Sequence, residues 1–464
     1  MKWQSAVRAL CGSICAVLAA CSVGPAYKRP DIASPAQWHD APAEAATVSV
    51  WPEAQWWHGF GSPRLDELIA EAERSNDDLA GAVARVQEAD AQVRIAGAPL
   101  FPTIDVGATA TRERTFTGGG SSIGNIFNPQ ITASYELDFW GKNRALRAAA
   151  RATAVGSRYD QETVALTVVS SVAGTYFQAL EFRDRIQVAQ QNLENGQKIL
   201  RGLQLEQSAG IATGLDVAQQ ETAVALLEAA LPPLLQQFRQ SVNALAILIG
   251  KTPESIDVTA GTLTELSTPT IVAGLPSQLL SRRPDVASAE QQLIAANADI
   301  TVARAALFPS IDLTASGGYA SNKLASLISP ANRVYAVSAG LTQPIFHGGA
   351  LRGQVSYSDA RYTELLTTYH KTVLTAFGNV ESALVAARQT ADQQERQREA
   401  VVKARRAYQF AQTQMSAGTV NILTVLNTEN ALFSAQDVLV QVQYAHLQAL
   451  IDLFTALGGG WHQG

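Results

Sequence analysis

The chain has 464 residues, of which 47% are hydrophobic and only 16% are charged. Intrinsic disorder requires low hydrophobicity and high net charge, so this composition excludes a disordered protein. The 35 basic and 41 acidic residues give a net charge of −6, which disfavours nucleic-acid binding because that needs a basic face. The mean hydropathy is only +0.02, so the chain has few charges without being strongly hydrophobic. These values do not say where its apolar residues lie.

The first twenty residues are typical of an export signal. Two basic residues precede an apolar run that is too short to span a bilayer, and small residues follow it. The run ends in Leu18-Ala19-Ala20-Cys21, which resembles a bacterial lipobox. We therefore expect residues 1–20 to be removed and Cys21 to carry a covalent lipid. The alternative is an ordinary signal peptide that happens to contain a cysteine.

The sequence contains a long internal repeat. Residues 76–105 align with residues 283–312 at twelve of thirty positions, and both segments end in Leu-Phe-Pro-x-Ile-Asp. Ser208-Ala209-Gly210 recurs as Ser416-Ala417-Gly418. This period is far longer than that of solenoid repeats, so it indicates two copies of one large unit. The predicted organisation is an extended acylated segment over 21–64, a first repeat over 65–260, a linker over 261–282 and a second repeat over 283–464.

Four segments alternate between polar and apolar residues, which predicts strands with one apolar face. They occupy residues 103–111, 130–139, 310–316 and 335–342. The stretches within the two pairs, 117–128 and 322–332, are rich in Gly, Ser and Asn and are predicted to be loops. An ordinary soluble sandwich is the alternative use of such strands.

Long helices are predicted in the rest of each repeat. An alanine-rich helix precedes the strands, over 77–98 and 284–306, and a Phe-Pro pair ends it. After the strands, 142–208 and 350–416 contain no proline, and each predicts one helix of roughly 100 Å. A glycine turn and a returning helix follow in each repeat, over 215–249 and 423–457. Pro232 and Pro233 are predicted to interrupt the first returning helix, because proline removes a backbone donor.

Strands of about ten residues suit a tilted crossing of a bilayer, but an open sheet edge in lipid would leave backbone groups without partners. Closure therefore requires several chains. Two chains would supply eight strands, whose interior side chains fill, whereas three would supply twelve and leave room for a channel. We expect a homotrimer whose helical hairpins continue the barrel as a tube. The alternative is a lipid-anchored periplasmic coiled-coil protein, structural or adaptor-like, without transmembrane strands.

Motifs along almost the whole chain resemble those of one family. They include Gly24-Pro25, Trp56-Trp57, Asn76-x-Asp78-Leu79, Glu136-Leu137-Asp138-x-Trp140-Gly141, Arg282-Arg283-Pro284-Asp285 and Pro344-Ile345-Phe346-x-Gly348-Gly349. With them the chain resembles the TolC-like outer membrane factor family, in the acylated branch of OprM and NodT-type efflux lipoproteins. The resemblance implies a mixed α and β fold: a trimeric twelve-strand transmembrane β-barrel with four strands per chain, a long periplasmic α-helical barrel and a mixed equatorial belt.

The resemblance also implies a function and partners. Such a protein is an outer membrane channel that passively conducts substrates in a tripartite efflux pump, together with a periplasmic adaptor and an inner-membrane transporter of the RND type. It is a homotrimer in the outer membrane of a Gram-negative bacterium, in contact with membrane lipid and anchored by the lipid on Cys21. No metal, other cofactor or nucleic-acid partner is implied. Drugs, solvents, aromatic acids and metal ions all stay open as substrates.

The functional positions of the family fall at the two hairpin tips. The resemblance implies that the adaptor contacts these tips at Gly210, Thr213, Gly214, Gly418 and Asn421.

A periplasmic gate is implied by a ring of leucine and, one turn later, a ring of acidic residues. Leu423 matches the leucine, but Asn427 stands at the acidic position, so the charge of the ring stays open. Asp216, beside the other tip, is an alternative source of negative charge. Ordinary structural roles are open for both residues: a helix N-terminal carboxylate for Asp216 and coiled-coil packing for Leu423.

Two segments resemble enzyme motifs, but their predicted context does not fit. Gly120-Ser121-Ser122-Ile123-Gly124 fits a serine nucleophile elbow but is predicted to lie in a loop between strands, not at a strand-to-helix turn. Gly250-Lys251-Thr252 resembles the end of a phosphate-binding loop, but Leu245 stands in place of its first glycine. We therefore expect a protein that is not an enzyme and has no catalytic residue.

Overall fold

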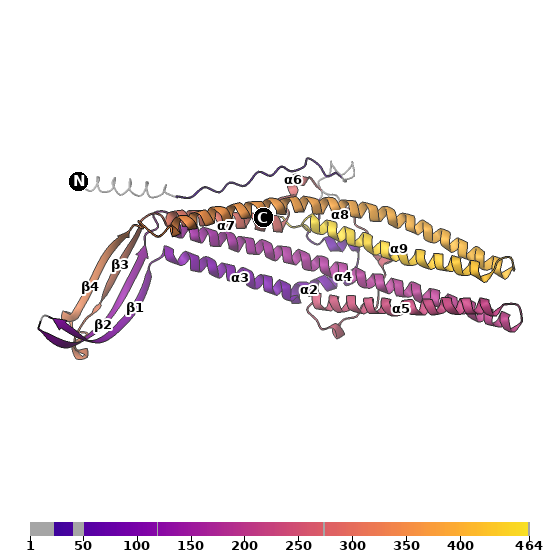
Figure 1. Cartoon of the computed structure of the whole chain (residues 1–464), viewed down its shortest axis with the longest axis horizontal. Coiled ribbons are helices and arrows are strands. Elements are labelled where there is room, and N and C mark those ends of the chain that lie inside the picture. Colours follow the sequence, from indigo (N-terminus) through magenta and orange to yellow (C-terminus); the bar gives the residue numbers. More distant parts are fainter. Residues whose placement is uncertain (1–22, 40–50, 118, 272–273, 463–464) are drawn as a thin grey trace. The chain divides into compact units, whose positions relative to one another are not determined.

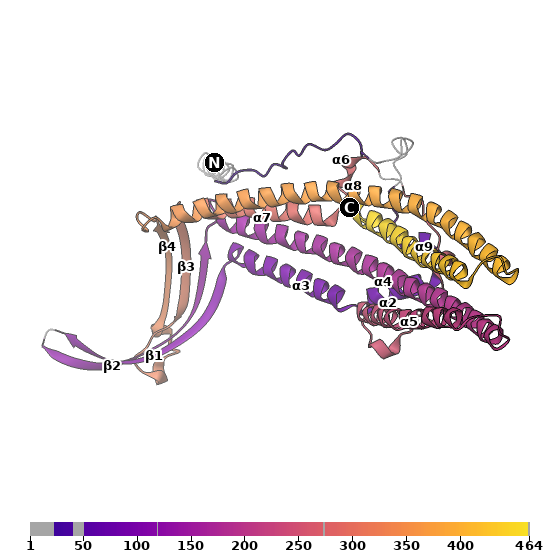
Figure 2. The ribbon, with the colours of Figure 1, turned by 45° about the vertical axis from the view of Figure 1, so that its right-hand side comes forward.

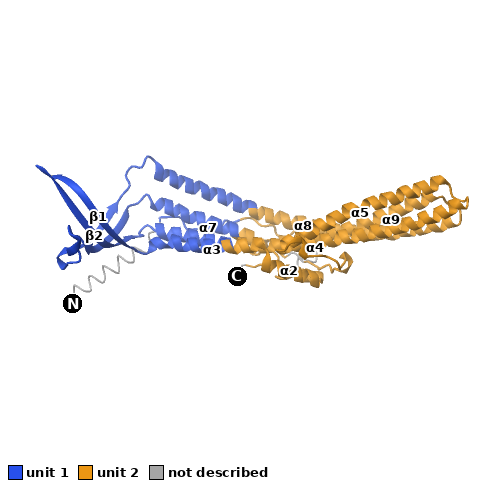
Figure 3. Ribbon diagram, turned by 90° about the horizontal axis from the view of Figure 1, so that it is seen from below, with its two compact units in different colours: residues 1–31, 85–158, 288–371 blue, residues 32–84, 159–287, 372–464 orange. Residues whose placement is uncertain are grey.

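The structure, a computed structural model, describes residues 23–39, 51–117, 119–271 and 274–462. The chain forms two compact units, and both predicted repeats contribute to each of them (Figure 3). Unit 1 consists of residues 1–31, 85–158 and 288–371, and unit 2 of residues 32–84, 159–287 and 372–464. The predicted signal peptide and Cys21 lie outside the described residues.

Unit 1 contains one antiparallel sheet in the order β1-β2-β3-β4 (Figure 1). Its strands are β1 (Thr103–Thr117), β2 (Gly120–Glu136), β3 (Ser310–Tyr319) and β4 (Arg333–Thr342). All four predicted strands are confirmed. The predicted loop between β3 and β4 is confirmed too, with short 3-10 helices at Leu324–Ser326 and Pro330–Asn332.

The first hairpin is longer than its sequence predicts. β1 and β2 pair from Thr103 opposite Ser134 as far as Thr117 opposite Gly120, so the predicted loop over 117–128 is wrong. The Gly-x-Ser-x-Gly motif consequently lies within β2 and not in a loop. A ladder is built from backbone donors and acceptors, which Gly, Ser and Asn supply like other residues, so composition alone misplaced the turn.

The helices have nearly the predicted bounds. They are α2 (Pro63–Ser75), α3 (Asp77–Gly97), α4 (Lys142–Ser208), α5 (Gly214–Leu248), α6 (Pro276–Leu279), α7 (Pro284–Ala305), α8 (Ala350–Ser416) and α9 (Ile422–Ala456). Further 3-10 helices lie at Trp56–Phe60, Ala98–Leu100, Pro253–Ser255 and Leu263–Glu265. Within unit 2, α5 returns beside α4 and α9 beside α8, forming two hairpins (Figures 1 and 2).

The helix α5 continues through Pro232 and Pro233, so the predicted interruption is wrong. Each proline removes one backbone donor from the helix and thereby frees the carbonyl four residues earlier. These carbonyls belong to Glu228 and Ala229, which are exposed like the prolines themselves. Water can therefore hydrate the freed groups, and the helix is maintained by its packing on either side.

Unit 2 has an aromatic core that joins the N-terminal segment to the helices. Trp56 stacks on Phe454 with ring centroids 4.8 Å apart, and Phe60 meets Phe177 edge to face at 5.0 Å. α4 passes through this core. Among the described residues it is also the one helix long and apolar enough to cross a membrane by composition, but half of its apolar 18-residue window is buried.

Candidate functional site

The four-stranded sheet has one apolar face and one polar face. The register pairs residues one to one along all three strand pairs, so each strand residue is assigned to a face without ambiguity. One row across the sheet consists of Val106, Ile131, Gly317 and Tyr335. This face is exposed, with 80% of Val106 and 88% of Tyr335 accessible. A sheet with one exposed apolar face suits a wall between lipid and water.

The charged residues of the strands are sorted between the two faces by sign. On the apolar face of the described strands, the charged side chains are all cationic: Arg112, Arg114 and Arg333. On the polar face, the charged side chains are all carboxylates: Asp105, Glu113, Glu136 and Asp312. This sorting was not predicted, although Arg112-Glu113-Arg114 displays it in three successive residues. The predicted strand ended at residue 111, so these three residues were not assigned to a strand, whereas β1 extends to Thr117.

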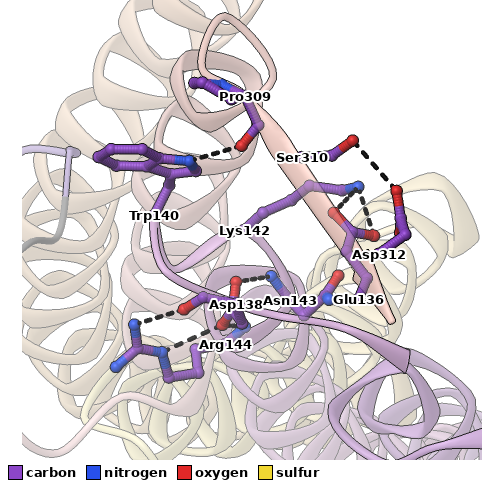
Figure 4. A network of polar contacts seen from close by, with 9 residues as sticks. All are labelled: Glu136, Asp138, Trp140, Lys142, Asn143, Arg144, Pro309, Ser310 and Asp312. Atoms are coloured by element: carbon purple, nitrogen blue, oxygen red, sulfur yellow. Dashed lines mark hydrogen bonds and ion pairs between the residues drawn. The ribbon is translucent and has the colours of Figure 1, made fainter. Parts of the chain in front are cut away.

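The passage from β2 into α4 is fixed by side-chain contacts of Asp138 (Figure 4). Its carboxylate accepts hydrogen bonds from the backbone N–H groups of Asn143 and Arg144, both at 3.0 Å. The Nε of Arg144 donates to the same carboxylate at 3.1 Å. An acidic residue in this position caps the free donors of the helix N-terminus and complements its dipole. The Asp138 side chain thus helps to determine where α4 begins.

Trp140 ties this junction to the residues just before β3, and an ion pair ties β2 to α4 (Figure 4). The indole N–H of Trp140 donates to the carbonyl of Pro309 at 2.8 Å, and its ring stacks on Phe308 with centroids 4.8 Å apart. Nζ of Lys142 lies 2.9 Å from Oε1 of Glu136. The family motif around Trp140 therefore has a structural role, which is to fasten the two repeats together at the strand ends.

The two hairpin tips in unit 2 are built in the same way. Gly210 and Gly418 have φ values of 77° and 73°, a left-handed conformation that favours glycine. The next residue in each tip, Ile211 or Thr419, donates its backbone N–H to a carbonyl five residues earlier, at 2.8 and 2.9 Å. This is the Schellman pattern of a helix end. The predicted repeat is thus visible in the hydrogen bonding of the two turns.

The returning helices also begin alike. Thr213 caps α5, and Asn421 caps α9 by accepting from the backbone N–H of Thr424 at 3.3 Å. Gly214 is the first residue of α5. All five predicted adaptor-contact residues therefore lie in the tips or at the helix starts beside them. Their contact with an adaptor stays a prediction.

Asp216 forms a capping box with Thr213. Its Oδ2 accepts from the Thr213 hydroxyl at 2.6 Å and from the Thr213 backbone N–H at 2.8 Å. These two hydrogen bonds hold the pKa of Asp216 below its usual value. Asp216 therefore has the ordinary role of a helix N-terminal carboxylate, and it is ionised in that role.

Leu423 and Asn427 lie four residues apart on α9, which places them on one side of the helix. Leu423 is 48% exposed, and Asn427 is exposed as well. The buried side of α9 is formed instead by Ile422, Val425 and Leu426. Leu423 thus takes no part in the apolar core of its own chain, and both side chains are free to face other subunits. Their role in a gate stays a prediction.

A buried carboxylate near the tips was not predicted from the sequence. The tip cluster contains Leu203 of α4, Val217 of α5, Tyr408 of α8 and several residues of α9. Glu429 of α9 is buried beside it, 5% exposed, and its Oε1 accepts from the hydroxyl of Tyr408. Burial raises the pKa of Glu429 to about 7. Within the described part of the chain, no group of His, Cys, Asp or Glu side chains is placed to hold a metal.

Comparison with known proteins shows which family the chain belongs to. The sequence model described as "Outer membrane efflux protein" matches residues 68–251 and 275–459, one match in each half of the chain. The chain belongs to this family. It is 41% identical to the pyoverdine export outer membrane protein OpmQ of Pseudomonas aeruginosa, over 97% of this chain and 96% of that protein. It is 32% identical to the probable efflux pump outer membrane protein TtgC of Pseudomonas putida, over 96% of this chain and 94% of that one.

A solved structure gives the same fold. The outer-membrane channel OprN superposes with a TM-score of 0.88 at 25% sequence identity, covering 95% of this chain and all of that one. The predicted TolC-like fold and the predicted function are thereby confirmed. This outer membrane efflux protein is a channel of the bacterial outer membrane, and its long helices form the periplasmic portion.

Proposed function

We propose that three copies of this outer membrane efflux protein close their sheets into a twelve-strand barrel and join their hairpins into a helical tube beneath it. The observation that carries the proposal is the two-faced sheet with free edges, since β1 and β4 each pair on one side only among the described strands. In lipid those edges require partners. A trimer also places the four carboxylates of each sheet around a water-filled lumen, whereas eight strands would leave no channel.

Planar bilayer recording tests the closure. Purified trimer is expected to conduct, and native mass spectrometry in detergent is expected to give three chains. A protein that remains a monomer, or that forms no conducting unit at any voltage, contradicts the barrel. The coiled-coil alternative predicts that outcome.

The hairpin tips are the proposed contact with a periplasmic adaptor, which connects the channel to an inner-membrane transporter of the RND type. Ile211, at the α4–α5 tip, is 76% exposed, and Leu215 is exposed nearby. Apolar side chains displayed at a turn are suited to docking. Ile211→Ser is expected to reduce co-purification with the periplasmic adaptor. Leu226→Ser, which alters an exposed apolar residue of α5 away from the tip, is the matched control.

The proposed gate is a ring of three Leu423 side chains with Asn427 one turn further along α9. Leu423→Ser is expected to raise the resting conductance of the trimer, because the apolar constriction is lost. Asn427→Asp is expected to make the conductance sensitive to divalent cations, since three carboxylates then face one another. Unchanged conductance in Leu423→Ser would remove Leu423 from the gate.

A siderophore of the pyoverdine class is the proposed cargo. The proposal is supported by the higher identity of the chain to the pyoverdine export protein than to the probable efflux pump protein. A deletion strain is expected to retain its siderophore in the periplasm and to secrete less of it. Normal secretion with increased sensitivity to solvents or antibiotics would assign the channel to a drug pump instead.

We also propose that Cys21 carries the lipid anchor predicted by the lipobox. Intact mass spectrometry of the membrane protein is expected to show diacylglycerol and acyl groups on the N-terminal peptide. Cys21→Ser is expected to remove them. An unmodified N-terminus after cleavage elsewhere contradicts the anchor.

A further inference from the structure

A shallow groove of about 510 Å³ lies on the apolar face of the sheet in unit 1. Its walls come from all four strands and include Val106, Ile131, Tyr319, Arg333 and Tyr335, with Gly317 between them. Apart from Arg333 and the two tyrosine hydroxyls, these side chains are apolar. The groove therefore offers a place for a hydrocarbon chain.

The groove exists because Gly317 has no side chain. It occupies one row with Val106, Ile131 and Tyr335, whose side chains rise on either side of it. A Cβ at position 317 would meet no atom within 4 Å. The space above this glycine is thus open, and a larger side chain would occupy it without a clash.

A positive charge stands at the end of the groove that points toward the strand turns. Arg333 is exposed and pairs with Tyr319 across β3 and β4, one step from the Gly317 row. Arg112 and Arg114 continue the same face toward the β1–β2 turn. None of these arginines forms an ion pair with another described residue, and the described strands place no carboxylate on this face. An anion from outside the chain can therefore pair with these arginines.

The position of the groove in the membrane follows from the family. The helices are periplasmic and join the strands at one end, so the strand turns point to the cell surface. The arginines therefore lie at the level of the outer leaflet. Tyrosine side chains such as Tyr319 and Tyr335 are typical of the zone where hydrocarbon meets headgroups. Closure into a barrel would use the backbone of the sheet edges and would leave the outward side chains in contact with lipid.

We infer that the groove binds one acyl chain of a phosphorylated, acylated glycolipid of the lipid A class, and that Arg333 binds its phosphate. Guanidinium and phosphate form charge-assisted, paired hydrogen bonds, which a lysine makes less well. The outer leaflet of this membrane supplies such a glycolipid, whereas phospholipids belong to the inner leaflet. The inference concerns the lipid face of the sheet and does not depend on the cargo or on the adaptor.

Native mass spectrometry of the full chain with purified bisphosphorylated lipid A tests the inference. Gly317→Leu is expected to abolish the stoichiometric adduct by filling the groove. Gly340→Leu is the matched control, because Gly340 lies on the opposite face and a Cβ there has only an ordinary contact of 3.9 Å. Equal retention of lipid A by both variants overturns the groove. Loss in Gly317→Leu alone, with an unchanged oligomeric state, supports it.

The charge is tested separately. Arg333→Gln is expected to weaken binding of bisphosphorylated lipid A about fivefold and to leave binding of dephosphorylated lipid A unchanged. Arg333→Lys is expected to recover part of the loss. Glu113→Gln, on the polar face, is the control. If phosphatidylglycerol competes as well as lipid A, or if Arg333→Gln weakens both lipid A forms alike, the phosphate assignment is wrong.

Discussion

The hydroxyl of Tyr408 on α8 donates a long hydrogen bond, 3.5 Å, to the buried carboxyl group of Glu429 on α9. It joins the outgoing and returning helices of the second hairpin a few turns from its tip. Burial is the largest cause of the raised pKa of Glu429, about 7, and the hydrogen bond from Tyr408 opposes it. No cationic side chain is among the causes of the shift. The carboxyl group therefore loses its proton at a pH that the periplasm can experience.

Glu429→Gln is expected to remove a pH dependence from the stability of the hairpin. Because the pKa of the folded state lies above the ordinary value, the folded chain binds more protons than the unfolded chain between about pH 4 and 7. Stability therefore falls as the pH rises through this window. The glutamine variant should be more stable than the parent at pH 8, by about 1–3 kcal/mol, and similar to it at pH 5. Thermal unfolding at the two pH values measures this.

Tyr408→Phe is the companion variant. It removes the hydrogen bond that stabilises the ionised carboxyl group, so it should raise the pKa of Glu429 further and lower stability at pH 8 more than at pH 5. Equal losses at both pH values would show that Glu429 does not titrate in this window.

Helix lengths were predictable because they follow from local sequence. The absence of proline over 142–208 and 350–416, and glycine turns after each, determined the bounds of α4 and α8. Glu429 was not predictable, since its burial depends on side chains of other helices. Its spacing from Leu426 and Leu432 was the available signal: it occupies the apolar stripe of α9 at i+3 and i−3.

For the strands too, some features follow from local sequence and others depend on contacts with distant residues. Alternation located all four, but the extension of β1 through Arg112 and Glu113 depends on pairing with β2. Pro232 and Pro233 illustrate the opposite error. A strong local rule predicted a break, whereas exposure of the freed carbonyls and packing along the rest of α5 allow the helix to continue.

Removing either helix cap is expected to loosen one tip and not the other. Thr213→Ala and Asn421→Ala should each destabilise their own helix start by about 1 kcal/mol, because each cap satisfies a free backbone donor. Hydrogen exchange is expected to rise over the first turn of α5 in one variant and of α9 in the other. Faster exchange at both tips in either variant would contradict this independence.

Arg185 is expected to be a costly charged side chain to remove from unit 2. It bridges two carboxylates of different helices, with Nε 2.7 Å from Oδ1 of Asp437 and Nη1 3.2 Å from Oε1 of Glu181. Arg185→Ala should destabilise the protein by about 3 kcal/mol, because it leaves two largely buried carboxylates without their cation. Lys198→Ala breaks an exposed pair with Glu194 and should cost less than about 1 kcal/mol. Similar thermal midpoints for both variants would contradict the difference.

The carboxylates of the polar face should give the channel a preference for cations. Asp105 and Glu113 lie on this face at different heights, and the described strands place no cationic side chain there with them. In a trimer each would form a ring of three charges around the lumen, and such rings select for counter-ions. The double variant Asp105→Asn/Glu113→Gln should lower the cation-to-anion permeability ratio about twofold, read from the reversal potential in a KCl gradient. Arg112→Gln changes the charge of the lipid face at the same end of β1 and should leave the ratio unchanged. A ratio that follows Arg112 and not the carboxylates would show that the two faces are assigned the wrong way round.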